Sequence, residues 1–165
     1  MAKKKLLTRA AYFKRLKRFL PSHCSFCDSE NNDNLIIKKG NLWDLMFCLA
    51  PYWQYHLLLV PRRHFIEFAE MTSEELDEFI HFCNETLAKL RKMKLHYNDG
   101  APIDRYLFFW RSRDNQFDPI TKVIKPNHFH FHIAPEKEHL LDEVLDNSAH
   151  TIDTEEFIKL FNKIS

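Results

Sequence analysis

Residues 128–132 read His128-Phe129-His130-Phe131-His132, and this alternation is the strongest indication of both fold and function in the chain. Successive side chains of a β-strand point to opposite faces, so the three imidazoles share one face and the two phenyl rings share the other. We therefore predict a strand over 128–134 with a polar face and a core face. Alternate residues of a strand lie roughly 6.5 Å apart, so His128 and His132 cannot bind one metal ion together unless the strand bends. The three histidines are expected to have different roles.

The composition is that of one globular domain. The chain has 165 residues, of which 45% are hydrophobic and 15 are phenylalanines, enough for a sizeable core. Only two glycines occur, Gly40 and Gly100, which excludes a Gly-rich phosphate loop of the P-loop or Rossmann type. The formal net charge of +1 argues against a general nucleic-acid binder, and no nucleic-acid partner is expected.

The N-terminal segment is basic, whereas the rest of the chain is acidic. Residues 1–22 hold eight Lys and Arg and no acid. Apolar residues recur there at helical spacing, which predicts a basic amphipathic helix over 1–21: Leu6, Ala10, Phe13, Leu16 and Leu20. We interpret it as a surface helix docked on the domain, with membrane contact and organelle targeting as alternatives. No secretory or membrane-spanning run is present, so the expected location is cytoplasmic.

The remaining patterns predict an α+β fold. Strands are expected over 35–39 and 42–49, joined by a turn at Gly40-Asn41, then over 55–60, and over 105–111 as a central strand. Thr72-Ser73-Glu74-Glu75 is a capping box that begins a long helix ending near residues 98–102, and a last helix covers 153–164. The predicted apolar face of the long helix is Leu76, Phe79, Ile80, Cys83, Leu87, Leu90 and Leu95. We expect a five-stranded, mainly antiparallel sheet with the long helix packed on it and a helix at each terminus.

A second motif precedes the triad, His56-Leu57-Leu58-Leu59-Val60-Pro61-Arg62-Arg63-His64. Together, the two motifs resemble those of the histidine triad (HIT) family of nucleotide hydrolases and transferases, over most of residues 22–135. The segments 1–21 and 136–165, the latter a C-terminal helical extension, lie outside this HIT-like domain. The resemblance implies that His130 attacks an α-phosphorus to give a covalent nucleotidyl-histidine, and that His132 and His56 stabilise the phosphate charge or protonate the leaving group. It also implies a homodimer.

The pair Cys24-x-x-Cys27 has the spacing of metal ligands. An isolated pair of this kind is also compatible with free thiols or a redox couple. In zinc-bearing HIT proteins and the similar galactose-1-phosphate uridylyltransferases, the histidine that ends the Pro-x-x-His strand and the first histidine of the triad complete the ligand set. The resemblance therefore implies a structural zinc ion on Cys24, Cys27, His64 and His128.

The chain departs from the family pattern around the nucleoside. Cys48 stands where many members have an acidic residue that holds the ribose, and a thiol accepts hydrogen bonds poorly. Lys125 and Asn127 replace a polar stretch that binds phosphate in the family. Other substrate-binding candidates are Phe47, with Trp43 and Leu35, as an apolar wall that could equally be core, and Arg111, with Arg113 and Asn115, on a loop that could equally be solvated.

Three functions remain open at this point. The first is a HIT hydrolase or nucleotidyl transferase that acts on a nucleoside phosphate ester, anhydride or phosphoramidate. The second is a catalytically weak, zinc-stabilised nucleotide-binding module, because Cys48 replaces the ribose-binding acid. The third is a cupin-like metal-dependent oxygenase, because His130, His132 and Glu136 have the spacing of cupin metal ligands.

Overall fold

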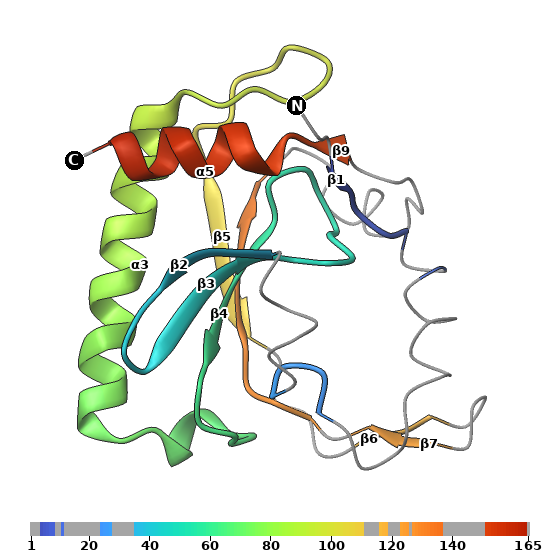
Figure 1. The fold of residues 1–165 in the computed structure, drawn as a ribbon, viewed down its shortest axis with the longest axis vertical. Coiled ribbons are helices and arrows are strands. Elements are labelled where there is room, and N and C mark those ends of the chain that lie inside the picture. Colours follow the sequence, from blue (N-terminus) through green and yellow to red (C-terminus); the bar gives the residue numbers. More distant parts are fainter. Residues whose placement is uncertain are drawn as a thin grey trace.

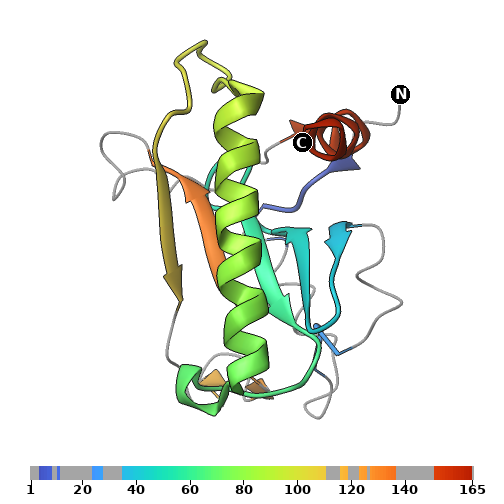
Figure 2. The ribbon, with the colours of Figure 1, turned by 90° about the vertical axis from the view of Figure 1, so that its left-hand side faces the viewer.

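The computed structural model describes residues 4–8, 11, 24–27, 35–110, 116–118, 123–125, 127–136 and 151–164. Five antiparallel strands form the main sheet, in the order β2-β3-β4-β8-β5. Their bounds are Ile36–Lys39 (β2), Trp43–Phe47 (β3), Leu57–Pro61 (β4), Phe131–Pro135 (β8) and Tyr106–Trp110 (β5). The long helix α3, Ser73–Met93, lies across one face of this sheet (Figures 1 and 2). The predicted α+β class and five-stranded sheet are confirmed.

The triad strand differs from its prediction at its first residues. Strand β8 begins at Phe131, so His128 and His130 lie in the segment that leads into it. The alternation still separates core from chemistry, because Phe131 packs edge-on against Phe79 of α3 whereas His132 lies on the opposite face. Strand β5 lies at the edge of the sheet rather than in its centre, and its Trp110 is 46% exposed. Its Phe108 and Trp110 contact Phe131 on the α3 side of the sheet, and its Phe109 contacts His132 on the other side.

Helix α3 begins as predicted and ends earlier. The Thr72 side chain accepts a hydrogen bond from Glu75 N–H, and the Glu75 side chain caps the Thr72 N–H in return. The helix ends at Met93, because Lys94 adopts a left-handed conformation with φ 49°. Its buried residues are Glu75, Phe79, Phe82, Thr86, Leu90 and Met93, whereas Ile80 is 48% exposed. The buried face is therefore rotated from the predicted one, because two polar residues, Glu75 and Thr86, belong to it.

The β2–β3 turn depends on Gly40 for space rather than for an unusual backbone angle. Its φ is not positive, but a Cβ at this position would lie 2.6 Å from the Trp43 carbonyl oxygen and would overlap the Glu78 carboxylate. That carboxylate accepts hydrogen bonds from Leu42 N–H at 3.1 Å and from Trp43 N–H at 3.3 Å. The turn is thus closed against α3.

Replacing Gly40 with alanine is expected to destabilise the fold by about 1–3 kcal/mol, because the added methyl group overpacks a site bounded by backbone. Urea unfolding of the purified protein measures this loss. Gly100→Ala is the matched control, since its Cβ would meet open space and the cost comes only from its φ of 85°. If Gly40→Ala were no less stable than Gly100→Ala, the steric explanation would be wrong.

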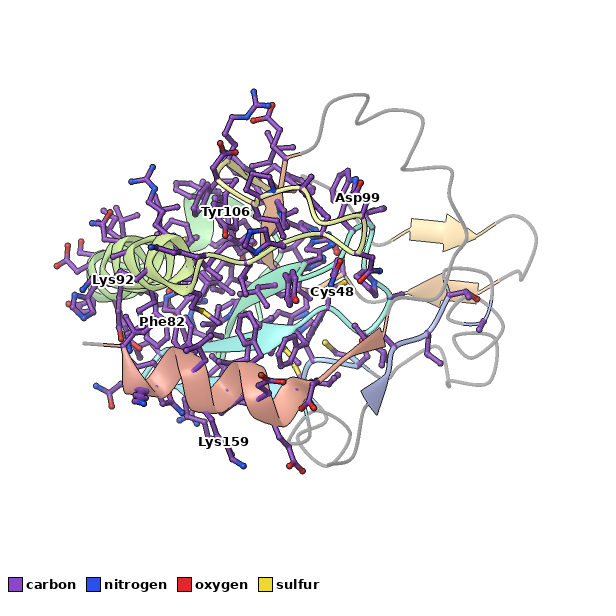
Figure 3. All side chains as sticks on the ribbon, turned by 90° about the horizontal axis from the view of Figure 1, so that it is seen from above. Cys48, Phe82, Lys92, Asp99, Tyr106 and Lys159 are labelled. Atoms are coloured by element: carbon purple, nitrogen blue, oxygen red, sulfur yellow. The ribbon has the colours of Figure 1, made fainter. Side chains whose placement is uncertain are left out.

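Residues distant in sequence meet at one end of the sheet. Strand β1, Lys4–Lys5, pairs with β9, Thr151–Ile152, and helix α5, Thr154–Lys163, follows at once (Figure 1). Leu6 is 1% exposed and belongs to the main core. The side chains of α3 and α5 lie against one another (Figure 3). Among them, Lys89 lies over the ring of Phe161. The C-terminal helix is confirmed, and its Asp153 accepts the capping hydrogen bond from Glu156 N–H.

The predicted N-terminal helix is not seen in its first residues, because Leu6 to Thr8 are not helical. Residues 9, 10 and 12–23 lie outside the described residues, so the rest of this helix and the division into units 1–21, 22–135 and 136–165 stay predictions. A short pair, β6 (Gln116–Asp118) with β7 (Val123–Lys125), completes the strands, and a single 3-10 turn covers Phe68–Glu70. None of the described helices has both the length and the apolar character that a membrane span requires.

Candidate functional site

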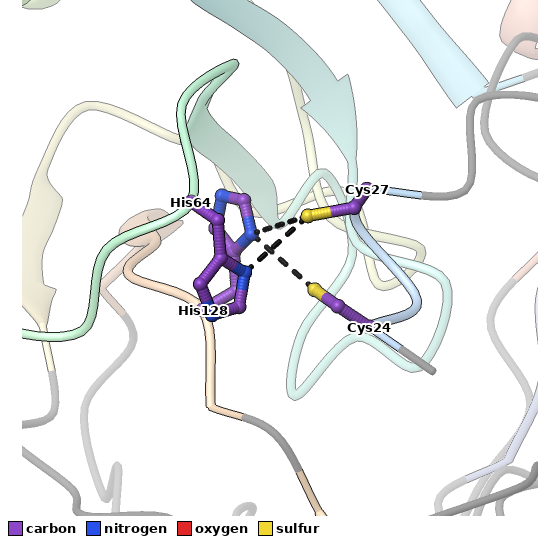
Figure 4. A group of neighbouring side chains, drawn as sticks. All are labelled: Cys24, Cys27, His64 and His128. Atoms are coloured by element: carbon purple, nitrogen blue, oxygen red, sulfur yellow. Dashed lines mark hydrogen bonds between the residues drawn. The ribbon is translucent and has the colours of Figure 1, made fainter. Parts of the chain in front are cut away.

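Four side chains form the one group of potential metal ligands within the described part of the chain, and they are the predicted ones (Figure 4). The Nδ1 atom of His64 lies 3.3 Å from Cys27 Sγ, and His128 Nδ1 lies 3.3 Å from Cys24 Sγ and 3.4 Å from Cys27 Sγ. All four ligand atoms lie within 4.8 Å of one another. Tetrahedral zinc with two sulfurs and two nitrogens places neighbouring ligand atoms about 3.5 Å apart. The cluster therefore fits a zinc ion.

Three chain segments hold these ligands. The cysteines belong to one tight turn, closed by a hydrogen bond from Cys27 N–H to the Cys24 carbonyl at 3.1 Å. His64 follows the end of β4, and His128 precedes β8. Since β4 and β8 are adjacent antiparallel strands, the end of one and the beginning of the other meet at the same edge. The metal cluster thus joins the cysteine turn to the sheet.

The protonation of the ligands also suits a cation. His128 donates its Nε2 proton to the Pro61 carbonyl at 2.9 Å, so its Nδ1 lone pair faces the two sulfurs. Burial lowers the pKa of His128 to about 4, which keeps the imidazole neutral. Burial and the neighbouring Cys24 thiol raise the pKa of Cys27 to about 11, so a cation is needed to keep the Cys27 sulfur as a thiolate at neutral pH.

His130 has a fixed tautomer. Its Nδ1–H donates to the main-chain carbonyl of His128 at 2.8 Å, which leaves the lone pair on Nε2. The ring of Phe26, from the cysteine turn, packs against the His130 ring with centroids 5.0 Å apart. A neutral imidazole whose lone pair is on Nε2 can act as a nucleophile through that nitrogen. The side chain of His128 therefore contacts the two cysteine sulfurs, whereas its main-chain carbonyl accepts the hydrogen bond from His130.

His56 and His132 form a chain of hydrogen bonds behind His130. Tyr52 N–H donates to His56 Nδ1 at 3.1 Å, so the proton of the His56 ring resides on Nε2. That nitrogen lies 2.9 Å from His132 Nδ1, which accepts a hydrogen bond from it. A neutral His132 then carries its own proton on Nε2, and its ring lies 4.7 Å from that of His130, centroid to centroid. The arrangement places a hydrogen-bond donor beside a nucleophile.

Aromatic rings hold the two imidazoles in place. Phe109 pairs with His132 across β5 and β8, and their rings stack at 4.5 Å and 4°. Tyr52 stacks on His56 at 5.3 Å and 23°. His56 and His132 are both buried, at 0% and 5% exposure. Neither Tyr52 nor Phe109 was predicted as part of the site. The pairing of β5 with β8, which places Phe109, could not be read from either strand alone.

The predicted nucleoside-binding residues are not gathered into one place by the described structure. Cys48 is buried, and its N–H donates to the His56 carbonyl at 3.0 Å, closing the loop between β3 and β4. Phe47 is fully buried and packs against Phe157 of α5, so its ring is part of the core. Asn127 is half-buried next to His128. The backbone of Lys125 lies in β7, and Arg111 lies outside the described residues, as do Arg113 and Asn115.

The cupin interpretation is wrong, because cupins are double-sheet jelly rolls and this chain has one main sheet covered by α3. In addition, the Nδ1 atoms of His130 and His132 are engaged with the His128 carbonyl and with His56. Glu136 forms no metal-binding group with these histidines among the described residues. The spacing His-x-His-x-x-x-Glu arises here from the HIT-like strand.

An ion pair between the exposed Arg63 and the buried Glu75 braces the segment that carries His64. Arg63 donates to both carboxylate oxygens of Glu75, from Nε at 2.8 Å and from Nη2 at 2.7 Å, and its guanidinium lies over the ring of Phe65. Glu75 also caps α3, and its carbonyl accepts the indole proton of Trp43 at 2.8 Å. The start of α3 is thereby joined to the residue before a metal ligand.

This pair predicts a specific acid sensitivity. The Arg63 guanidinium holds the pKa of Glu75 below its ordinary value of 4.5, so its stabilisation is present above that value and is lost as the pH falls through the lower, folded pKa. Glu75→Gln keeps the cap but not the charge, and we expect its unfolding free energy to decline less than that of the native protein between roughly pH 5 and pH 3. Denaturant titration at each pH measures this. The control Asp77→Asn, on the exposed side of the same helix, should retain the native slope.

Comparison with known proteins finds solved structures of similar fold. No protein-family model and no curated protein matches the chain. A solved uridylyltransferase mutant superposes with a TM-score of 0.61 at 20% identity, over 93% of this chain and 49% of that one. A zinc-bound histidine triad family protein from Mycobacterium smegmatis gives a TM-score of 0.58 at 18% identity, over 86% and 92% of the two chains.

A third structure, the diadenosine triphosphate hydrolase of Plasmodium falciparum in complex with cyclomarin A, gives a TM-score of 0.51 at 13% identity. It covers 79% of this chain and 74% of its own. The chain thus spans about half the length of the uridylyltransferase and most of the length of the smaller proteins. The predicted HIT fold is confirmed by these superpositions.

Proposed function

We propose that the chain is a zinc-containing HIT enzyme that cleaves a nucleoside phosphate ester, anhydride or phosphoramidate through a nucleotidyl-His130 intermediate. The observation that carries this proposal is the hydrogen bond from His130 Nδ1 to the His128 carbonyl, which leaves Nε2 as the nucleophilic nitrogen. The similar structures include enzymes named for uridylyl transfer and for diadenosine triphosphate hydrolysis, which supports a nucleotide substrate.

The first step forms a bond from His130 Nε2 to the α-phosphorus and breaks the bond from that phosphorus to the leaving group, which keeps the electron pair. His132 donates a hydrogen bond from Nε2 to a non-bridging oxygen of the α-phosphate, because His56 occupies its Nδ1, and the leaving group takes up a proton from water. In the second step, water or another acceptor attacks the phosphorus and loses its proton to solvent. The P–N bond breaks, and its electron pair returns to His130 Nε2, which restores the starting tautomer.

Zinc on Cys24, Cys27, His64 and His128 would supply structural support, since all four positions of a tetrahedral ion are taken by protein ligands. Its effect on the chemistry is indirect and passes through the main chain of His128. The same imidazole that faces the sulfurs belongs to the residue whose carbonyl orients His130. The metal ligand set thus fixes the position of that carbonyl.

Trapping of the intermediate tests this function. Wild-type protein is mixed with adenosine polyphosphates, nucleoside phosphoramidates or aminoacyl adenylates and quenched in alkali, where a P–N bond survives. Intact mass should rise by one nucleotidyl group, and peptide mapping should place it on His130. Turnover with the adduct on another residue, or direct hydrolysis with no adduct in a rapid-quench series, would contradict the covalent mechanism.

A catalytically weak nucleotide-binding module is the second candidate, favoured by the buried thiol of Cys48 where the family has a ribose-binding acid. Calorimetric titration with nucleoside monophosphates distinguishes the two. Binding without turnover of any substrate in the panel would support the module. Cys48→Asp then offers a direct comparison, since a carboxylate would restore a strong acceptor for ribose hydroxyls.

A further inference from the structure

Tyr55, the residue directly before His56, has a left-handed backbone with φ 60°. Among the described residues other than glycine, only Lys94 shares a positive φ, and Lys94 ends a helix, where this conformation is common. Tyr55 ends no helix, and a large aromatic residue adopts this conformation at a cost in energy. Contacts elsewhere in the fold must hold it there.

Those contacts come from helix α5. The Tyr55 ring stacks on Phe157 with centroids 5.8 Å apart and an angle of 25°. Phe157 is 4% exposed and meets Phe47 of β3 edge-on at 5.2 Å, so it cannot shift without disturbing the sheet. The helix is held in turn by the pairing of β9 with β1 and by Lys89 over Phe161. The segment after β1 is tied to the loop that contains Tyr55 by a hydrogen bond from Leu7 N–H to the Leu49 carbonyl at 3.0 Å.

The loop over residues 48–56 connects these contacts of α5 to His56 and fixes the position of its ring. Its two ends are joined by the hydrogen bond from Cys48 N–H to the His56 carbonyl. Within it, Tyr52 N–H holds His56 Nδ1, and Tyr55 sets the direction in which the chain enters His56. A change of φ at Tyr55 to a negative value would rotate the backbone of this short closed loop. Because both ends of the loop are fixed, the rotation would displace Tyr52 or the His56 ring and break the hydrogen bond between them.

We propose that Tyr55 and Phe157 are positioning residues of the active site, through which α5 holds the left-handed backbone that directs His56 into its hydrogen bond with His132. The effect on turnover rests on the proposed function, whereas the effect on the two imidazoles does not. Neither residue touches His132 or His130 in the contacts above, so neither is a catalytic residue. The C-terminal helix is in this sense part of the active site.

The test compares variants that separate ring packing from backbone strain. Tyr55→Ala and Tyr55→Gly both remove the ring, but only glycine adopts φ 60° without cost. Phe157→Ala removes the support and leaves the strain, and Phe157→Ala with Tyr55→Gly removes both. Leu160→Ala is the control, because it removes an apolar side chain of the same helix that is 37% exposed.

Two readouts are followed at one pH in the metal-loaded protein. Nitrogen-15 spectra of the imidazoles, assigned with His56→Gln, report the tautomer of His56 and its hydrogen bond to His132. Steady-state kinetics report kcat and KM. For Phe157→Ala we expect the His56 signal to lose its hydrogen-bonded shift and kcat to fall about 10- to 100-fold with little change in KM, as for lost stabilisation of charge in the transition state. The double variant should recover both, and Leu160→Ala should leave the His56 signal unchanged.

A merely structural role predicts the opposite order, with the double variant worse than Phe157→Ala alone. That order, or a native His56 signal in folded Phe157→Ala, would overturn the proposal. If Phe157→Ala does not fold, Phe157→Leu takes its place, and Tyr55→Gly must show a more native His56 signal than Tyr55→Ala. Since the spectra need no substrate, absence of nucleotide turnover in the wild type would refute the proposed function and leave this test decisive.

Discussion

Replacing His130 with alanine is expected to lower the rate of nucleotide cleavage on the order of 10⁴-fold or more, because the variant has no nitrogen to form the covalent intermediate. The fold should be retained, since His130 is half-buried and its hydrogen bond to the His128 carbonyl is local. Single-turnover kinetics with the best substrate of the panel measure the loss, and thermal unfolding checks the fold.

The matched control for this variant is His81→Ala. His81 lies on α3 with a side chain that is 76% exposed, and it is remote from the triad in the sheet. Its removal should leave kcat and KM unchanged. If His130→Ala and His81→Ala turned over substrate equally well, His130 would not be the nucleophile, whatever the fold.

Replacing Cys24 with serine is expected to release the metal and to destabilise the protein by several kcal/mol. A structural zinc site in a small domain contributes on the order of 10 kcal/mol of binding energy that depends on the folded state. Three of the chain's segments meet at this cluster, so its loss frees the cysteine turn from the sheet. Metal analysis after dialysis, together with denaturant unfolding, measures both effects.

Cys83→Ser is the control for the metal prediction. Cys83 is half-buried on α3, outside the metal cluster, and burial raises its pKa to about 12, so its thiol is unreactive at neutral pH. This variant should keep one equivalent of zinc. Full zinc content in Cys24→Ser would show that Cys24 is not a ligand.

Much of the site could be predicted because it depends on periodicity and on short motifs. The alternation of His and Phe correctly separated a core face from a chemical face, and the capping box correctly located the start of α3. The four ligands of the metal cluster were predicted from the family resemblance, and the structure brings them together. The alternation and the capping box can be predicted from sequence because each depends on residues within one strand or one helix end.

The contacts that could not be predicted join segments distant in sequence. The rotation of α3 was missed because Glu75 is buried by its pairing with Arg63, and hydrophobicity alone places a glutamate outside. The edge position of β5 depends on strand order, which no single strand encodes. The left-handed Tyr55 gave no signal either, since Gly or Asn is the usual residue at such a position.

The pairing of β1 with β9 has a consequence for the order in which the protein folds. It joins residues 4–5 to residues 151–152, so nearly the whole chain lies between the partners. Contacts of such high sequence separation form late, because the entropy of closing the intervening loop must be overcome first. During synthesis, the sheet and α3 can assemble while α5 is still inside the ribosome. We therefore expect the nascent chain to acquire its metal-binding cluster before His56 is set, so that catalytic competence arrives only once β9 and α5 have left the ribosome and paired with the rest of the fold.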